Sequence, residues 1–272
     1  MQLVAKYIID HPTDFGLDPV RRTAENIGVS TYSLVRAAKT LGFGSFTELR
    51  GPFRHALVAA PQTGMKPFLP DIGADASPVA RAHFDSARNA ASIVQASLDR
   101  LRSDQIEAAA SLMLSARNVY VTAVRSSYAI AYYLHYVGRM ALPSLQLIPR
   151  HMNSAIDELN EAGPSDVMVA ISVTPCSRET IDACKFAQSK GVRIILLTDS
   201  AVAPPVLDPD ITFEASTLST HHFACFTGLM AIVETLLAAL VVTGGTDARN
   251  RIASYEMLRD SFDAYWPPRK KQ

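Results

Sequence analysis

The chain has 272 residues, and its 26 lysines and arginines balance 26 aspartates and glutamates. With 48% hydrophobic and 19% charged residues, the composition excludes wholesale disorder, a collagen and a coiled-coil rod. A net charge of zero weighs against nucleic-acid binding by the chain as a whole, although charge can be partitioned between domains.

The charge is in fact unevenly divided. Residues 1–60 hold seven bases and five acids, a net of +2, so the remainder carries −2. Between Pro19 and Arg54 there are six bases and two acids, a local +4. If residues 1–60 bind DNA, so modest a positive charge means that two copies of this segment are needed for useful affinity. Non-specific DNA binding should then be weak and salt-sensitive.

The three cysteines are too few, and odd in number, for a disulfide framework, which favours a reducing compartment. Lys6 and Asp10 interrupt any signal-peptide core. The apolar run Ala224–Val242 is long enough to span a bilayer, but Glu234 lies in its middle. We therefore expect a buried core or interface helix and no membrane contact.

Prolines and glycines concentrated between residues 61 and 78 predict a linker. It separates a helical N-terminal domain, residues 1–60, from a connecting helix over 79–102 and an α/β domain over 103–265. Ser103 is the expected N-cap of the first helix of that last domain.

Apolar runs typical of strands alternate with helical patterns after residue 103. This alternation predicts a parallel sheet covered on both faces by helices. The expected fold class is an all-α helix-turn-helix head plus an α/β three-layer domain with a mostly parallel five-stranded sheet. The expected strands are Asn118–Val124, Leu145–Ile148, Asp166–Ser172, Val192–Thr198 and the weaker Ile211–Phe213, and the expected helices are Ser127–Ala141, Ser154–Glu161, Arg178–Lys190 and Phe223–Val242.

The segment from Pro19 to Phe43 has the layout of a helix-turn-helix. Gly28 permits the left-handed backbone that ends one helix, and Ser30 can cap the next. In the second helix, Leu34, Ala38 and Leu41 are expected to face inward.

The other residues of that second helix project away from the expected core. A recognition helix puts such side chains against base edges and phosphates, and Arg36 can reach a guanine edge or a phosphate. A small helical bundle with a solvated basic face has the same pattern. The candidate DNA contacts are Thr31, Tyr32, Ser33, Arg36 and Lys39.

The run from Ala24 to Phe43, followed by Phe46–Arg50, resembles the N-terminal helix-turn-helix of the RpiR/MurR family of bacterial regulators. Residues from about Ser103 to Val242 are similar to the family's sugar isomerase (SIS) domain. The resemblance implies a cytoplasmic transcription factor that binds double-stranded operator DNA as a homodimer or homotetramer and senses a phosphorylated sugar. Family members usually have residues ahead of the Val4–Pro12 helix, so either a short first helix or a late start codon is expected.

Two loops follow expected strands at the sheet edge where ligands bind in open parallel sheets. The first, Ala123–Ser127, resembles a SIS pattern like G-x-G-x-S, with Ala123 and Arg125 in place of the glycines. Arg125 would either obstruct the backbone approach of a phosphate or supply it with a cation. The second, Ser172–Ser177, resembles S-x-S-G-x-T, with Pro175 in place of the glycine.

Hydroxyl side chains in these loops are the candidate ligand-binding groups. N-capping is the alternative role, because serine is a default capping residue. The candidates are Ser126, Ser127, Ser172, Thr174 and Ser177, with Thr180 a weaker one.

A sugar-phosphate isomerase, or a dimeric module that only binds sugar phosphates, is the competing function. Isomerisation needs a general base and an acid. No acid–base pair is identifiable among the candidates, so neither a catalytic residue nor a cofactor is expected. His221, His222 and Cys225 suggest a metal only superficially, because adjacent histidines do not easily face one ion, and no metal is expected. The candidates for acid–base chemistry are Glu158, Glu161, Glu179, His221 and His222.

Overall fold

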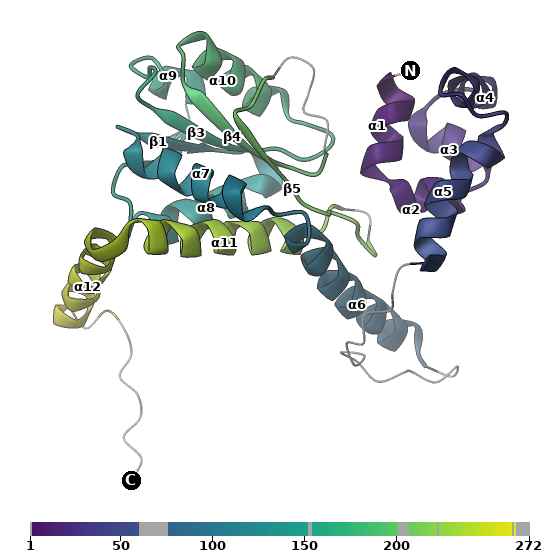
Figure 1. Ribbon diagram of the computed structural model, residues 1–272. Coiled ribbons are helices and arrows are strands. Elements are labelled where there is room, and N and C mark those ends of the chain that lie inside the picture. Colours follow the sequence, from purple (N-terminus) through teal and green to yellow (C-terminus); the bar gives the residue numbers. More distant parts are fainter. Residues whose placement is uncertain are drawn as a thin grey trace. The chain divides into compact units, whose positions relative to one another are not determined.

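The computed structural model describes residues 2–59, 76–151, 154–200, 207–221, 223–262 and 264 (Figure 1). The chain divides into two compact units, one made of residues 1–84 with 200–202 and the other of the remainder. Nearly all of the expected linker, 61–78, lies outside the described residues, as do His222 and the basic tail from Arg269. The domain boundaries expected from the sequence therefore stay predictions.

In the first unit, helices α1 to α5 enclose a small apolar core. Phe15 is fully buried at its centre and meets the rings of Phe46 and Phe53 edge to face, with centroids 5.4 and 5.2 Å away. Arg50 donates to the Asp18 carbonyl at 2.6 Å. The helices are α1 (Gln2–Asp10), α2 (Pro12–Leu17), α3 (Val20–Ile27), α4 (Thr31–Thr40) and α5 (Phe46–Ala59).

The turn between α3 and α4 has the expected chemistry. Gly28 ends α3 with a φ of 74°, a conformation open to glycine without steric cost. Ser30 caps α4 by accepting a hydrogen bond from the Ser33 N–H at 3.2 Å. The expected inward face of α4 is partly wrong, because Leu41 lies at the C-cap and is 51% exposed. Ala37 takes its place beside Leu34 and Ala38.

The second unit is built on a five-stranded sheet in which all neighbouring strands are parallel, in the order β2-β1-β3-β4-β5. Every residue of β1 and β3 is buried, as a sheet covered on both faces requires. All five strands were predicted: β2 has the expected ends, and the ends of the other four differ by at most two residues. They are β1 (Val119–Thr122), β2 (Leu145–Ile148), β3 (Val167–Ile171), β4 (Arg193–Thr198) and β5 (Ile211–Glu214).

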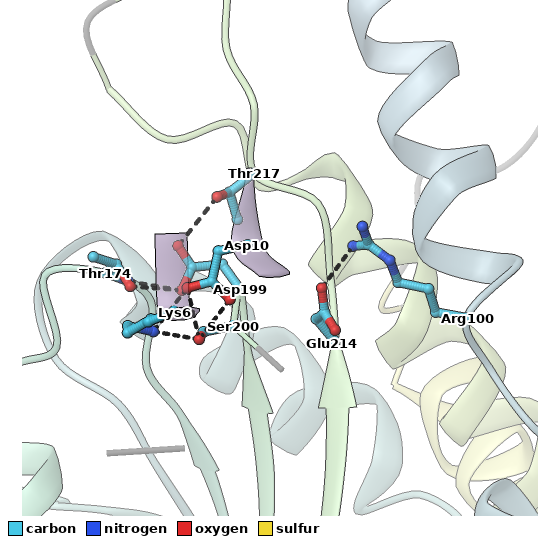
Figure 2. Close-up of polar contacts among 8 residues, drawn as sticks. All are labelled: Lys6, Asp10, Arg100, Thr174, Asp199, Ser200, Glu214 and Thr217. Atoms are coloured by element: carbon cyan, nitrogen blue, oxygen red, sulfur yellow. Dashed lines mark hydrogen bonds and ion pairs between the residues drawn. The ribbon is translucent and has the colours of Figure 1, made fainter. Parts of the chain in front are cut away.

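Alternate residues of the strands enter two separate cores, which gives the three layers (Figure 1). One face packs against α7, α8 and α11, and the other against α9 and α10. An ion pair of 3.0 Å joins Arg100, which follows α6, to Glu214 at the end of β5 (Figure 2). The helices are α6 (Pro78–Leu98), α7 (Ser103–Ser115), α8 (Tyr128–Gly138), α9 (Ala155–Glu158), α10 (Arg178–Ser189), α11 (Thr227–Thr243) and α12 (Gly245–Ser261), with a short 3-10 turn at Arg125–Ser127 before α8.

Two details differ from expectation. Arg102, and not Ser103, is the N-cap of α7, and no side chain caps that helix. Gly244 and Gly245 form a sharp corner of 109° between α11 and a helix that the sequence did not predict, α12.

No single helix in the described ranges is long and apolar enough to cross a membrane, although the bent pair α11 and α12 would be by length and composition alone. α11 buries Leu229, Ile232 and Leu236 in the sheet core, as expected for a core helix.

A buried carboxylate ties the amino ends of β1 and β3 together. Asp166 is fully buried and accepts hydrogen bonds from Arg117 at 2.6 and 3.0 Å, from the Gly163 N–H at 2.9 Å, and from Asn118. Burial alone would raise the pKa of Asp166, but these donors outweigh it, and the pKa lies below the ordinary value.

Asp166→Ala is expected to lower the free energy of unfolding by about 2 kcal/mol, because the partly buried N–H donors lose their acceptor. Since the folded-state pKa is the lower one, this contribution is complete above the unfolded pKa of about 4 and disappears as the pH falls through the folded pKa. Urea unfolding between pH 7 and pH 2 measures it. Asp182→Ala is the control, since Asp182 is half exposed and 3.9 Å from Lys185, and we expect a change of less than about 0.5 kcal/mol.

Candidate functional site

A cavity of about 420 Å³ opens at the carboxyl edge of the sheet, where β1 and β3 end side by side. We call it the inner cavity. The loop after β1 lines one side, the loop after β3 another, and the segment leading into α11 adds Phe223, Ala224 and Phe226. The structure brings together all five hydroxyl residues expected from the sequence, and also Thr180. The loop residues in the lining are Val124, Arg125, Ser126, Ser127, Ile171, Ser172, Val173, Thr174, Pro175, Ser177 and Thr180.

Two hydroxyls in this lining are buried without a hydrogen-bond partner among the described residues. Ser172 is 4% exposed and Thr180 is 1% exposed. The Ser172 Oγ and the Thr180 Oγ1 nevertheless make no hydrogen bond to another described residue. Leaving a buried hydroxyl unpaired costs about 1–3 kcal/mol. An arrangement that keeps two such groups at one cavity indicates a site prepared for a polar ligand.

The capping alternative does not account for the two serines at the helix starts. Ser127 precedes α8 and Ser177 precedes α10, but neither side chain accepts a capping hydrogen bond. The Ser177 hydroxyl instead donates to the Glu179 carboxylate. This bond, with a weaker contribution from Arg125, lowers the pKa of Glu179. The two serine hydroxyls are therefore not committed to capping, and the Tyr128 N–H at the start of α8 instead donates to the Arg125 and Ser126 carbonyls.

Thr174 is held by the carboxylate of Asp199, which is not among the candidate ligand-binding residues expected from the sequence. The backbone N–H and the hydroxyl of Thr174 both donate to Asp199 Oδ1, at 2.9 and 3.1 Å (Figure 2). Thr217 donates to Asp199 Oδ2 at 3.3 Å. Asp199 directly follows β4, so its signal in the sequence is an acidic residue at the ligand-binding edge of the sheet. It fixes the loop after β3 to the segment after β5.

Arg125 stands in an unusual backbone conformation, with a φ of 57°. The left-handed region costs a non-glycine residue about 1–2 kcal/mol. Arg125 is exposed and also lines a second cavity of about 520 Å³, the outer cavity, which shares Pro175 and Ser177 with the inner one. Backbone strain of this kind concentrates at functional sites.

In the helical unit, the candidate DNA contacts lie together on α4. Thr31, Tyr32, Ser33, Arg36 and Lys39 are all exposed, and Tyr32 keeps 75% of its surface accessible. The Ser33 hydroxyl lies 2.9 Å from that of Ser30, so it takes part in the cap. Arg50 has a structural role through Asp18 and leaves less of the local positive charge free for DNA.

The groups considered for catalysis are scattered. Glu158 binds Arg150 and is nearly buried, and Glu179 lines the outer cavity. His221 accepts a hydrogen bond from the Phe223 N–H. Over the ranges that the structure describes, no group of three or more histidine, cysteine, aspartate or glutamate side chains is placed to hold a metal ion.

The SIS domain family matches residues 112–243. Among solved structures, the sugar isomerase domain of an RpiR transcription factor from Sphaerobacter thermophilus is 26% identical, with a TM-score of 0.59 over 64% of this chain and 97% of that chain. The Vibrio vulnificus NanR protein complexed with ManNAc-6P has the same fold over 96% of this chain and 92% of that one, with a TM-score of 0.60 and 17% identity.

Two curated relatives show similar levels of identity. The HTH-type transcriptional regulator YfhH of Escherichia coli is 22% identical over 72% of this chain and 68% of the relative. The bifunctional protein glk of Burkholderia mallei is 23% identical over 72% of this chain, but the match spans only 30% of that protein's length. The all-α head with a three-layer α/β domain is thus confirmed as the fold class, and residues 112–243 of this chain are a SIS domain, within a chain similar to RpiR-type regulators.

Proposed function

We propose that this chain is a DNA-binding transcriptional regulator whose binding to operator DNA is modulated by a phosphorylated sugar bound in the inner cavity. One observation carries the proposal: hydroxyls from two loops, two of them buried and unpaired, converge on one cavity in a chain that also has a helix-turn-helix. We further propose that it acts in the cytoplasm as a homodimer or homotetramer.

The chemistry of the inner cavity suits a sugar phosphate. The loop hydroxyls and the Arg125 guanidinium are donors for a phosphate. Val173 and Phe226 offer apolar surface to a sugar ring. The volume of about 420 Å³ lies within the range of small-molecule sites. The similar NanR protein was solved in complex with a sugar phosphate, ManNAc-6P.

The same lining favours binding over isomerisation. Isomerisation requires a general base within hydrogen-bond reach of the substrate. The described lining of the inner cavity contains hydroxyls, one guanidinium and apolar groups, but no carboxylate or imidazole. A ligand bound there changes DNA affinity only if it binds one arrangement of the assembly better than another.

A gel-shift titration tests the function. The protein is mixed with the DNA upstream of its own gene and of neighbouring genes, at two salt concentrations, with and without a panel of sugar phosphates. We expect specific shifts that weaken with salt and respond to one sugar phosphate. The absence of a specific shift at both salt concentrations would contradict the proposed regulator function. Turnover of a sugar phosphate by the purified protein would support the competing isomerase function.

Arg125 gives a further prediction, because its strain and its charge can be separated. Arg125→Ala removes only the charge, whereas Arg125→Gly also relieves the positive φ. We expect both variants to bind the sugar phosphate about tenfold more weakly. The glycine variant should be about 1 kcal/mol more stable than the alanine variant. Calorimetry and urea unfolding measure the two effects, and tighter binding by either variant would show that Arg125 obstructs the site.

A further inference from the structure

We infer that the exposed face of α8, continued by the groove beside it, is the surface on which a second copy of this chain docks. Four of the nine tyrosines in the chain belong to α8. Tyr128, Tyr132 and Tyr136 recur every four residues and form one exposed row, in which Tyr132 keeps 52% of its surface accessible. We call this row, with Arg139, the tyrosine face.

The tyrosine face is ordered by contacts within itself. The Tyr132 and Tyr136 rings stack with centroids 6.0 Å apart and planes at 15°. The Arg139 guanidinium lies over the Tyr136 ring at 5.4 Å. Tyrosine and arginine are the residue types enriched at the centres of protein interfaces, and side chains already held in place lose little entropy on docking.

The spacing of the tyrosine face is self-complementary under twofold symmetry. In an antiparallel pair of α8 helices centred near residue 134, Tyr132 of each copy meets Tyr136 of the other. The same register sets Tyr128 of each copy opposite position 140 of the other, next to Arg139, so that a guanidinium lies near an aromatic ring. A twofold interface requires this reciprocity of a single patch, which favours a second copy over an unrelated partner.

The surface extends beyond α8, as a stable interface of about 800 Å² on each partner requires. Arg139 also lines a groove of about 590 Å³ between the end of α8 and α12, together with Met140, Pro143, Met257 and Leu258. Met257 and Leu258 are 66% and 53% exposed, and Ala248 is the only buried residue among those of α12. A 17-residue helix with so little burial is marginal alone and gains stability from a covering partner.

The placement of α8 also connects this surface to the inner cavity. The helix begins at Tyr128, directly after Ser127, so its first turn continues the loop after β1 without a break. A shift of that loop on ligand binding would therefore change the angle at which two tyrosine faces meet. The inference rests on the proposed function only for the second copy, and its tests use neither DNA nor sugar. A monomeric protein would overturn both this inference and the proposed homodimer, whereas an interface elsewhere would overturn this inference alone.

Sedimentation equilibrium of the full chain provides the first test. The unmodified protein should self-associate, and Tyr132→Glu with Tyr136→Glu should raise the dimer dissociation constant at least a hundredfold, since buried like charges would face each other. Leu218→Glu is the matched control, because Leu218 is 58% exposed and lies after β5, and it should leave association unchanged. A monomeric unmodified protein, or an unchanged double variant, overturns the inference.

Cross-linking tests the register without depending on how the glutamate variant folds. With Cys176 and Cys225 replaced by serine, Tyr132→Cys should give a covalent dimer with a short bismaleimide, because the two positions lie near the twofold axis. Leu218→Cys in the same background should stay uncross-linked. Association without a cross-link at position 132 places the interface elsewhere and overturns the inference.

Discussion

Replacing Ser172 by alanine together with Thr180 by valine is expected to stabilise the ligand-free protein and to weaken sugar-phosphate binding about a hundredfold. Both hydroxyls are buried at the inner cavity and unpaired in the described structure. Removing a buried hydroxyl that has no partner relieves its desolvation cost, about 1 kcal/mol for each group. The same removal takes from a bound phosphate two donors worth about a factor of ten each.

A gain in stability together with a loss of ligand affinity distinguishes a binding site from ordinary packing, where removing a side chain only destabilises the protein. Urea unfolding of the ligand-free protein should show a gain of about 2 kcal/mol for the double variant. Calorimetry with the sugar phosphate that shifts the wild-type protein's DNA complex measures the loss of affinity. A variant that is both less stable and unaltered in binding would mean that these hydroxyls serve the fold and not a ligand.

Two other buried hydroxyls supply the matched control. Ser97 Oγ donates to the Ile93 carbonyl at 2.6 Å and accepts from the Ser216 N–H at 2.9 Å. Thr122 Oγ1 donates to the Ile148 carbonyl at 3.1 Å. Because these groups are paired, Ser97→Ala with Thr122→Val should destabilise the protein by about 2 kcal/mol and leave sugar-phosphate binding unchanged.

The sequence predicted the parts of this site that depend on local pattern. Apolar strands followed by hydroxyl-rich loops indicated both loops, because parallel strands present their carboxyl ends at one edge. The sequence could not show that Ser172 and Thr180 are unpaired, because pairing depends on what else reaches the same small volume. The hydrogen bonds from Thr174 to Asp199 were not predicted for the same reason, since those residues are 25 positions apart.

The misses in the fold have equally local causes. Helical spacing placed Leu41 inward, but the helix ends there, and the chain turns its side chain outward. Helix α12 buries so little that no apolar face marked it in the sequence. The left-handed backbone of Arg125 goes against residue preference, so it was not predicted, although Arg125 stands where the SIS pattern has a glycine. Residue propensity and spacing thus gave wrong or missing predictions at the positions where tertiary packing or function decides the backbone conformation.

Arg36→Ala is expected to lower the affinity for operator DNA at least a hundredfold at physiological salt. Arg36 is exposed on α4, between the buried Leu34 and Ala37, so it projects from the side of the helix opposite the core. A bidentate contact from such an arginine to a guanine contributes about 1–3 kcal/mol of discrimination. In a symmetric dimer neither variant chain can make this interaction, so its free energy is counted twice.

The operator for this measurement is a fragment selected from random DNA with the unmodified protein, which avoids assuming a natural site. Lys39→Ala should behave differently, weakening specific and non-specific DNA binding alike and reducing the salt slope by about one for each phosphate that the variant no longer neutralises. Arg193→Ala is the arginine control, because Arg193 is exposed at the start of β4, at the amino edge of the sheet away from the inner cavity.

The unfolding free energy of Arg36→Ala separates recognition from folding. No hydrogen bond or ion pair of the Arg36 side chain joins it to the rest of the described head, so stability should change by less than about 0.5 kcal/mol. Sugar-phosphate binding, which uses the other unit, should be unchanged. If Arg36→Ala abolishes both DNA binding and sugar-phosphate binding, the residue is structural, and α4 is one helix of a bundle whose basic face is only solvated.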